Sequence, residues 1–248
     1  MRAPTTKRAR GTHRGSTGWT IGLALGLALG LTPGRAAAEA NTCAAGKLKC
    51  ARTFATAALK CYGPMAKKGL DAKTGSKGED CVRKARQKLG TAIASGPGCV
   101  EKVEARQNVA KPATVCPTAA DEYDLDDLVK DFTLTLVEDV LLTAAAPFGS
   151  TCDAGKLKCV GTLVKALLGC REKAAKKGVP VDPACEAKAW SKLDGGPNPA
   201  KGCFAKLEAK QKLGKLKSLC DPGGLDAETV VADLVDGLVG DVAGAVAP

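Results

Sequence analysis

Twelve cysteines are the residues of this 248-residue chain whose type and spacing can do chemistry. All of them follow residue 40, and no two stand in a C-x-x-C pair. A thioredoxin-like redox pair or a haem attachment site needs that pair, and zinc-thiolate sites use similarly short spacings. An even number of widely spaced cysteines in an exported chain indicates a disulfide framework instead. We therefore expect no cofactor and no metal ion.

The cysteines form two sets of six whose successive gaps are 7, 11, 20, 18, 17 and 7, 11, 15, 18, 17. The first three of each set fall on one line of a helix, too far apart to bond to one another, so each must pair with one of the last three. Spacing alone leaves fifteen connectivities open in each set. A nested hairpin predicts the pairs Cys61–Cys81, Cys50–Cys99, Cys43–Cys116, Cys170–Cys185, Cys159–Cys203 and Cys152–Cys220.

Catalytic groups are scarce in the rest of the chain. The only histidine, His13, lies in the leader, so the exported part lacks the imidazole of a Ser-His-Asp or Cys-His site. No serine occupies a G-x-S-x-G elbow. Glu104 and Glu208 recur in an E-A-[KR]-Q segment, and we expect them on solvated helix faces. The acidic run at 121–127 lacks the glycine of a calcium loop. These absences indicate a protein that is not an enzyme.

Charge is divided by segment. Residues 43–116 and 152–220 carry net charges of +10 and +9, whereas residues 121–142 and 221–248 carry −7 and −6. Acidic helices that pack against lysine-rich ones explain this division without any ligand. The alternative is an anion-binding surface for an envelope polymer or partner protein. We expect no nucleic-acid partner, because the chain is exported, aromatic side chains for base stacking are few and no recognised motif occurs. The candidate anion-binding lysines are Lys67, Lys68, Lys84, Lys88, Lys176, Lys177, Lys188 and Lys192.

Residues 1–40 have the order of a secretory signal peptide: a basic leader, an apolar run and small residues for cleavage after Ala38 or Ala40. The apolar run is roughly a dozen residues, shorter than the ~20 of a membrane-spanning helix. An uncleaved anchor is the alternative. We expect a secreted or periplasmic protein that has no transmembrane segment after cleavage.

The two cysteine sets belong to a repeat in which CAAGKLKC at 43–50 returns as CDAGKLKC at 152–159. Other residues keep the same register, which indicates a tandem duplication. The predicted organisation is a module at 41–143, a linker at 144–151 and a second module at 152–248. Each module ends in an acidic amphipathic helix. The five-residue insertion in the first module falls in the loop-like stretch at 73–80.

Helical periodicity recurs in every segment, and no segment alternates like a strand. Over 152–170 the cysteines share a face with Leu157, Val160, Leu163, Val164, Leu167 and Leu168, with Lys158, Thr162 and Lys165 opposite and Lys156 as a misfit. We predict an all-α fold of about four helices per module. Either Gly63-Pro64 or the glycine at 69 ends the first helix of module one, and Gly178 ends its equivalent.

Seven aromatic residues follow the leader, so covalent bridges must replace much of the stabilisation that large rings give a core. The leading hypothesis for function is an exported, non-enzymatic structural or binding protein that presents a lysine-rich surface to an envelope component, an anionic polymer or a partner protein. The alternative is a carrier that holds a lipid or other amphiphile in a cavity between the stapled helices.

Overall fold

Eight α-helices and no strand occur in the part of the chain that the computed structural model describes, which confirms the predicted all-α class. The described residues are 41–68, 72–90, 96–110, 116, 121–136, 151–215 and 224–246. The predicted signal peptide at 1–40 and residues 144–150 of the predicted linker lie outside them. The duplication and the module boundaries stay predictions.

The helices follow the order expected for each half of the chain. In the first half they are α1 (Thr42–Lys68), α2 (Ala72–Leu89), α3 (Cys99–Ala110) and α4 (Asp121–Thr135). In the second half they are α5 (Thr151–Lys177), α6 (Pro183–Asp194), α7 (Cys203–Lys212) and α8 (Gly224–Ala245), with a 3-10 turn at Pro199–Lys201.

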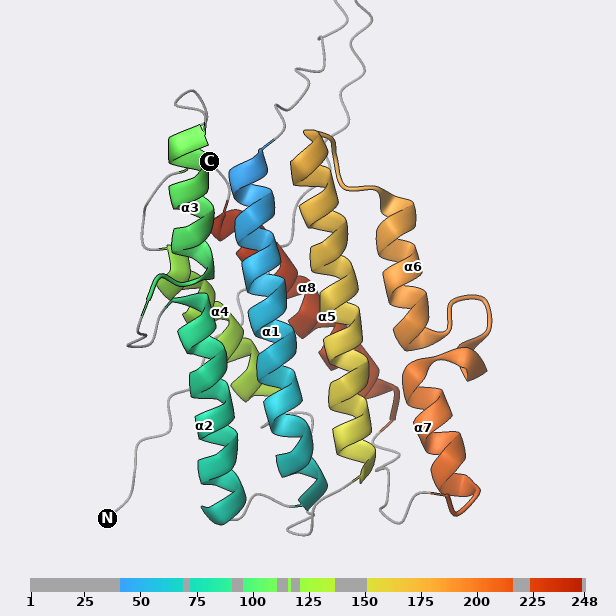
Figure 1. The fold of residues 1–248 in the computed structure, drawn as a ribbon. Helices are drawn as coiled ribbons and strands as arrows, with labels where there is room; N and C mark the ends of the chain where they lie inside the picture. The colour runs from blue at the N-terminus through green and yellow to red at the C-terminus, as the bar shows by residue number, and fades with distance from the viewer. Residues whose placement is uncertain are drawn as a thin grey trace, which may run out of the picture. The chain divides into compact units, whose positions relative to one another are not determined.

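The two long helices, α1 and α5, lie side by side and run in opposite directions (Figure 1). The Asn41 N–H at the start of α1 donates to the Ala175 carbonyl near the end of α5, at 2.9 Å. Helices α2 and α3 pack against α1, helices α6 and α7 pack against α5, and α4 contacts α8. We call the contact between α1 and α5 the seam. Because the seam joins the two halves, their buried side chains form one core.

The core is mainly aliphatic. The predicted apolar face of α5 is buried, and Lys158, Thr162 and Lys165 on its other face are exposed, as expected. The buried aromatic side chains of the described core are Phe54, Phe132 and Phe204. Small residues let helices approach closely instead. A Cβ on Gly46 would overlap Val103 of α3, and a Cβ on Gly155 would overlap Leu207 of α7. Each long helix therefore has a glycine where a side chain of the neighbouring helix packs against it.

Disulfides fasten the flanking helices to the long ones. The structure pairs Cys43 with Cys116, Cys50 with Cys99, Cys61 with Cys81, Cys159 with Cys203 and Cys170 with Cys185. These are five of the six pairs of the nested order, and each joins two residues of the same half. Cys152 is also disulfide-bonded, whereas its expected partner, Cys220, lies outside the described residues.

One expectation about helix boundaries needs correction, and one of the two alternatives for the end of α1 is wrong. The stretch at 73–80 is helical and not a loop, so α2 begins nine residues before Cys81. Packing accounts for this, because the missing side chain of Gly78 leaves room for Met65 of α1. Gly63-Pro64 does not end α1, which continues to Lys68. Gly178 does follow α5, with a φ of 62° that favours glycine.

Candidate functional site

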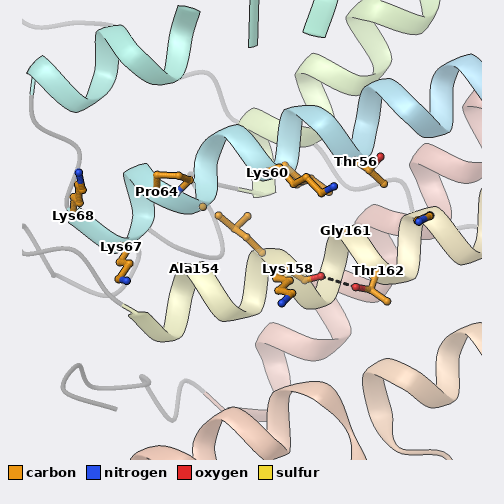
Figure 2. Close-up of a pocket in the computed structure, with 13 residues that line it drawn as sticks. Thr56, Lys60, Pro64, Lys67, Lys68, Ala154, Lys158, Gly161 and Thr162 are labelled. Carbon is orange, nitrogen blue, oxygen red and sulfur yellow. Dashed lines mark hydrogen bonds between the residues drawn. The ribbon is translucent and has the colours of Figure 1, made fainter. Parts of the chain in front are cut away.

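A half-open groove of about 670 Å³ lies along the seam, between the second half of α1 and the first half of α5. Its apolar part is formed by Leu59 and Leu157, both almost fully buried, together with Pro64 and Ala154. Gly63 and Gly161 add backbone without side chains. Figure 2 shows Lys60 and Lys67 of α1 and Lys158 of α5 flanking the groove. The groove therefore combines an apolar interior with a cationic edge.

Every charged residue that lines the groove is a lysine. They are Lys60, Lys67, Lys68, Lys158 and Lys165, and all five are exposed. None of them forms an ion pair within the described part of the chain. A lysine can lay its aliphatic stem along an apolar surface while its ammonium group stays in water. The five stems thus extend the apolar walls, and their ammonium groups give the edge a single sign of charge.

The eight lysines predicted from the sequence are all exposed but do not form one surface. Lys67 and Lys68 line the groove. Lys84 and Lys88 lie on α2, whereas Lys188 and Lys192 lie on α6. Lys176 and Lys177 end α5, at the other end of the seam from the groove. The structure therefore brings two of the predicted lysines together with three others, Lys60, Lys158 and Lys165, that sequence reasoning missed.

The missed residues follow a repeated spacing that is visible in the sequence. Positions i, i+4, i+7 and i+11 lie on one stripe of a helix. Thr56, Lys60, Gly63 and Lys67 have this spacing on α1, and Ala154, Lys158, Gly161 and Lys165 have it on α5. The spacing marks two lysine-bearing stripes, but it does not reveal that the stripes face each other across the seam.

At the other end of the seam, the corresponding space is filled. Arg52 and Glu172 form an ion pair across α1 and α5, with Nη1 and Oε2 2.9 Å apart. The Arg52 guanidinium lies over Gly169, where an added Cβ would come within 3.0 Å of Nη1. In the register of the repeat, a shift of 109 residues, Arg52 corresponds to Gly161 and Glu172 to Gly63. The groove is thus open where the matching positions carry a salt bridge.

Buried charge occurs near the start of each long helix. Lys47 is 1% exposed, and its Nζ lies 2.9 Å from Glu104 Oε1. Glu104 is 8% exposed, so the expectation that it lies on a solvated face is wrong. Lys156, the misfit on the apolar face of α5, is 5% exposed, with Nζ 5.7 Å from the centroid of the Phe204 ring. Cation–π contact of this kind offsets part of the desolvation of the ammonium group.

A second, smaller groove of about 300 Å³ lies where α1, α2 and α4 meet. Tyr62 lines it, and burial followed by the nearby Glu79 carboxylate raises the pKa of this phenol. Arg86 in the same groove donates to both carboxylate oxygens of Asp126. Because Arg86 is already paired, this groove offers less free positive charge than the one at the seam.

Comparison of the chain with protein-family models, curated proteins and solved structures gives no match. Among the described helices, none has both the length and the apolar character needed to cross a bilayer. The grooves and the charged surface are therefore the features of the molecule that bear on its function.

Proposed function

We propose that this chain is exported by the leader at 1–40 and acts in the periplasm or outside the cell as a non-enzymatic binding protein. In this proposal, two duplicated, disulfide-stapled halves present lysine-rich surface to an anionic component of the envelope. The seam groove is the centre of that surface.

The observation that supports this proposal is the one-sided charge of the groove. Five lysines and no acidic residue line it, within a chain that carries many carboxylates elsewhere. Where α1 and α5 carry charge at the other end of the seam, Arg52 is neutralised by Glu172. Clustered charges of one sign in a concave, partly apolar site attract oppositely charged ligands more strongly than the same charges spread over a surface.

The cysteines support the proposed location. No cysteine among the described residues is free, and paired cysteines in such numbers are typical of oxidising compartments outside the cytoplasm. Both walls of the groove are helices whose buried side chains belong to one core, so little ordering of the walls is needed on binding.

The test is binding to a fluorescently labelled anionic polymer without any hydrocarbon chain, dextran sulfate. Affinity should fall steeply with added salt, since screening shortens the reach of a charge from about 10 Å at 0.1 M to about 3 Å at 1 M. A triple variant, Lys60→Gln, Lys67→Gln and Lys158→Gln, should weaken binding roughly tenfold or more.

The matched control removes the same charge from two other helices, with Lys84→Gln, Lys188→Gln and Lys192→Gln. It should weaken binding much less than the groove variant. Binding that does not depend on salt, or equal losses in the two triple variants, would refute a groove-centred anion site.

A further inference from the structure

Gly161 and Gly63 leave space in the seam groove that side chains would fit. A Cβ built on Gly161 meets Leu59 at 3.6 Å, an ordinary van der Waals distance, and one built on Gly63 meets nothing within 4 Å. Glycine inside a helix is less stable than alanine, because it restricts the unfolded chain less. Packing therefore does not require glycine at Gly161. At Gly63 the following residue, Pro64, gives a separate reason, since proline crowds a preceding Cβ.

The matching positions show what a filled seam looks like. Arg52 and Glu172 are about three-quarters buried, with side chains 25% and 22% exposed, and their ion pair spans α1 and α5. Glycines at Gly161 and Gly63 remove both side chains and leave Leu59 and Leu157 as an apolar floor below five ammonium groups. The groove thus differs from its counterpart in two ways, by open apolar space and by unneutralised positive charge.

We infer that the seam groove binds a free long-chain fatty acid, with the hydrocarbon chain along Leu59 and Leu157 and the carboxylate among the lysines. This inference rests on the proposed function, because it names the ligand of the same groove. Both halves of the ligand are needed to match the site. A bare polyanion leaves the solvent-accessible apolar lining of the groove, Pro64, Ala154 and the lysine stems, in contact with water, whereas an uncharged hydrocarbon chain leaves the lysines unneutralised. The volume, about 670 Å³, lies within the ~300–1,000 Å³ of pockets that hold small molecules.

The experiment measures the affinity of the oxidised full-length protein for octanoate, decanoate, dodecanoate and tetradecanoate, each below its micelle concentration. Affinity should rise by about two- to fourfold per added methylene, the lower value applying where the half-open groove leaves a methylene partly in water. Dodecanol, which has the same chain without the charge, should bind roughly tenfold more weakly than dodecanoate. Affinities that do not change with chain length, or equal binding of dodecanol and dodecanoate, would overturn the inference.

The decisive variant is Gly161→Leu, which fills the floor and leaves all five lysines in place. Binding of dodecanoate should fall about tenfold or more, and salt-dependent binding of dextran sulfate should remain. Gly161→Arg, which copies the residue at the matching position, should have the same effect on dodecanoate while adding positive charge. The control is Gly240→Leu in α8, an exposed helical glycine with nothing within 4 Å of an added Cβ and no part in the groove. It should leave both ligands bound.

Gly161→Ala is a control for the case in which the larger substitutions prevent folding. It adds only a Cβ, should raise thermal stability, and should lower affinity for dodecanoate by about twofold. If folded Gly161→Leu and Gly161→Arg proteins bound dodecanoate unchanged, the hydrocarbon chain of the ligand would lie outside the groove and the inference would be refuted. Retained dextran sulfate binding in the same experiment would leave the proposed function standing. If the unmodified protein bound neither dodecanoate nor dextran sulfate in a salt-dependent way, both the proposed function and the inference would be refuted.

Discussion

The middle bridge of each half, Cys50–Cys99 and Cys159–Cys203, should contribute equally to stability although the two span 49 and 44 residues. The bridge nested inside each one, Cys61–Cys81 or Cys170–Cys185, gives the chain a shorter covalent path. That path runs through eleven residues before the inner bridge and eighteen after it in both halves, 29 in all. The five-residue insertion is bypassed.

Closing a loop of that length removes unfolded-state entropy worth about 3.6 kcal/mol at 25 °C. The perturbation is the double substitution Cys50→Ala and Cys99→Ala, compared with Cys159→Ala and Cys203→Ala. Because the two halves share one core, each variant should unfold in a single transition. The urea midpoint should move down by about 1–2 M for a typical urea dependence of ~2–3 kcal/mol per molar.

Urea unfolding followed by far-ultraviolet circular dichroism, with the remaining bridges verified by mass spectrometry, makes the measurement. If either variant lost less than about 1 kcal/mol, or if the two losses differed by more than about 1.5 kcal/mol, the bridges would not have the assigned role. Two separate transitions would show that the halves unfold independently, against the single core that the seam builds.

Two further predictions concern buried polar groups. Lys47→Met should lower the free energy of unfolding by about 3 kcal/mol, because it leaves the Glu104 carboxylate buried without its cation. Adding Glu104→Leu should restore most of that stability. A double-mutant cycle measured by urea unfolding in which the two effects are strictly additive would contradict this prediction. The raised pKa of Tyr62, caused first by burial, predicts that the contribution of Tyr62 to stability is constant below about pH 10 and falls above it, because the unfolded state then releases the phenolic proton first. Tyr62→Phe should remove that contribution in alkaline urea titrations, and the phenolate absorbance that this substitution removes should belong to a group that titrates above the ordinary pKa of tyrosine, about 10.

Helix positions and the buried face of α5 could be predicted because they depend on local periodicity. Cys152, Cys159 and Cys170 share one line of α5, and the leucines beside them had to face the same core. The sequence predicts a loop at 73–80 because Thr74, Gly75 and Gly78 favour one, whereas the structure has a helix there, α2, which packs against α1 with Gly78 next to Met65. Intrinsic preference of this kind is a weak guide where packing decides.

The groove could not be predicted because it depends on how the two halves meet. Periodicity shows that Lys158 and Lys165 lie opposite the main apolar face of α5, but not that this edge borders α1. Glu104 was misplaced for the same reason, since nothing in its own helix shows that Lys47 lies above it. The sequence did contain one signal for the buried Lys47–Glu104 pair. Lys156 lies on an apolar helix face, where a lysine needs a partner, and the position that matches Lys156 in the first half of the chain is Lys47.

The antiparallel seam has a consequence for stoichiometry. Two identical helices meeting in this way obey a two-fold axis, so any hollow at one end must recur at the other, and a symmetric pair offers either two equivalent sites or none. With both helices in one polypeptide, Arg52 and Gly161 are free to differ. One end of the seam can then be closed by side chains, as in a subunit interface, while the other end keeps an open groove. The expected stoichiometry is one ligand per chain.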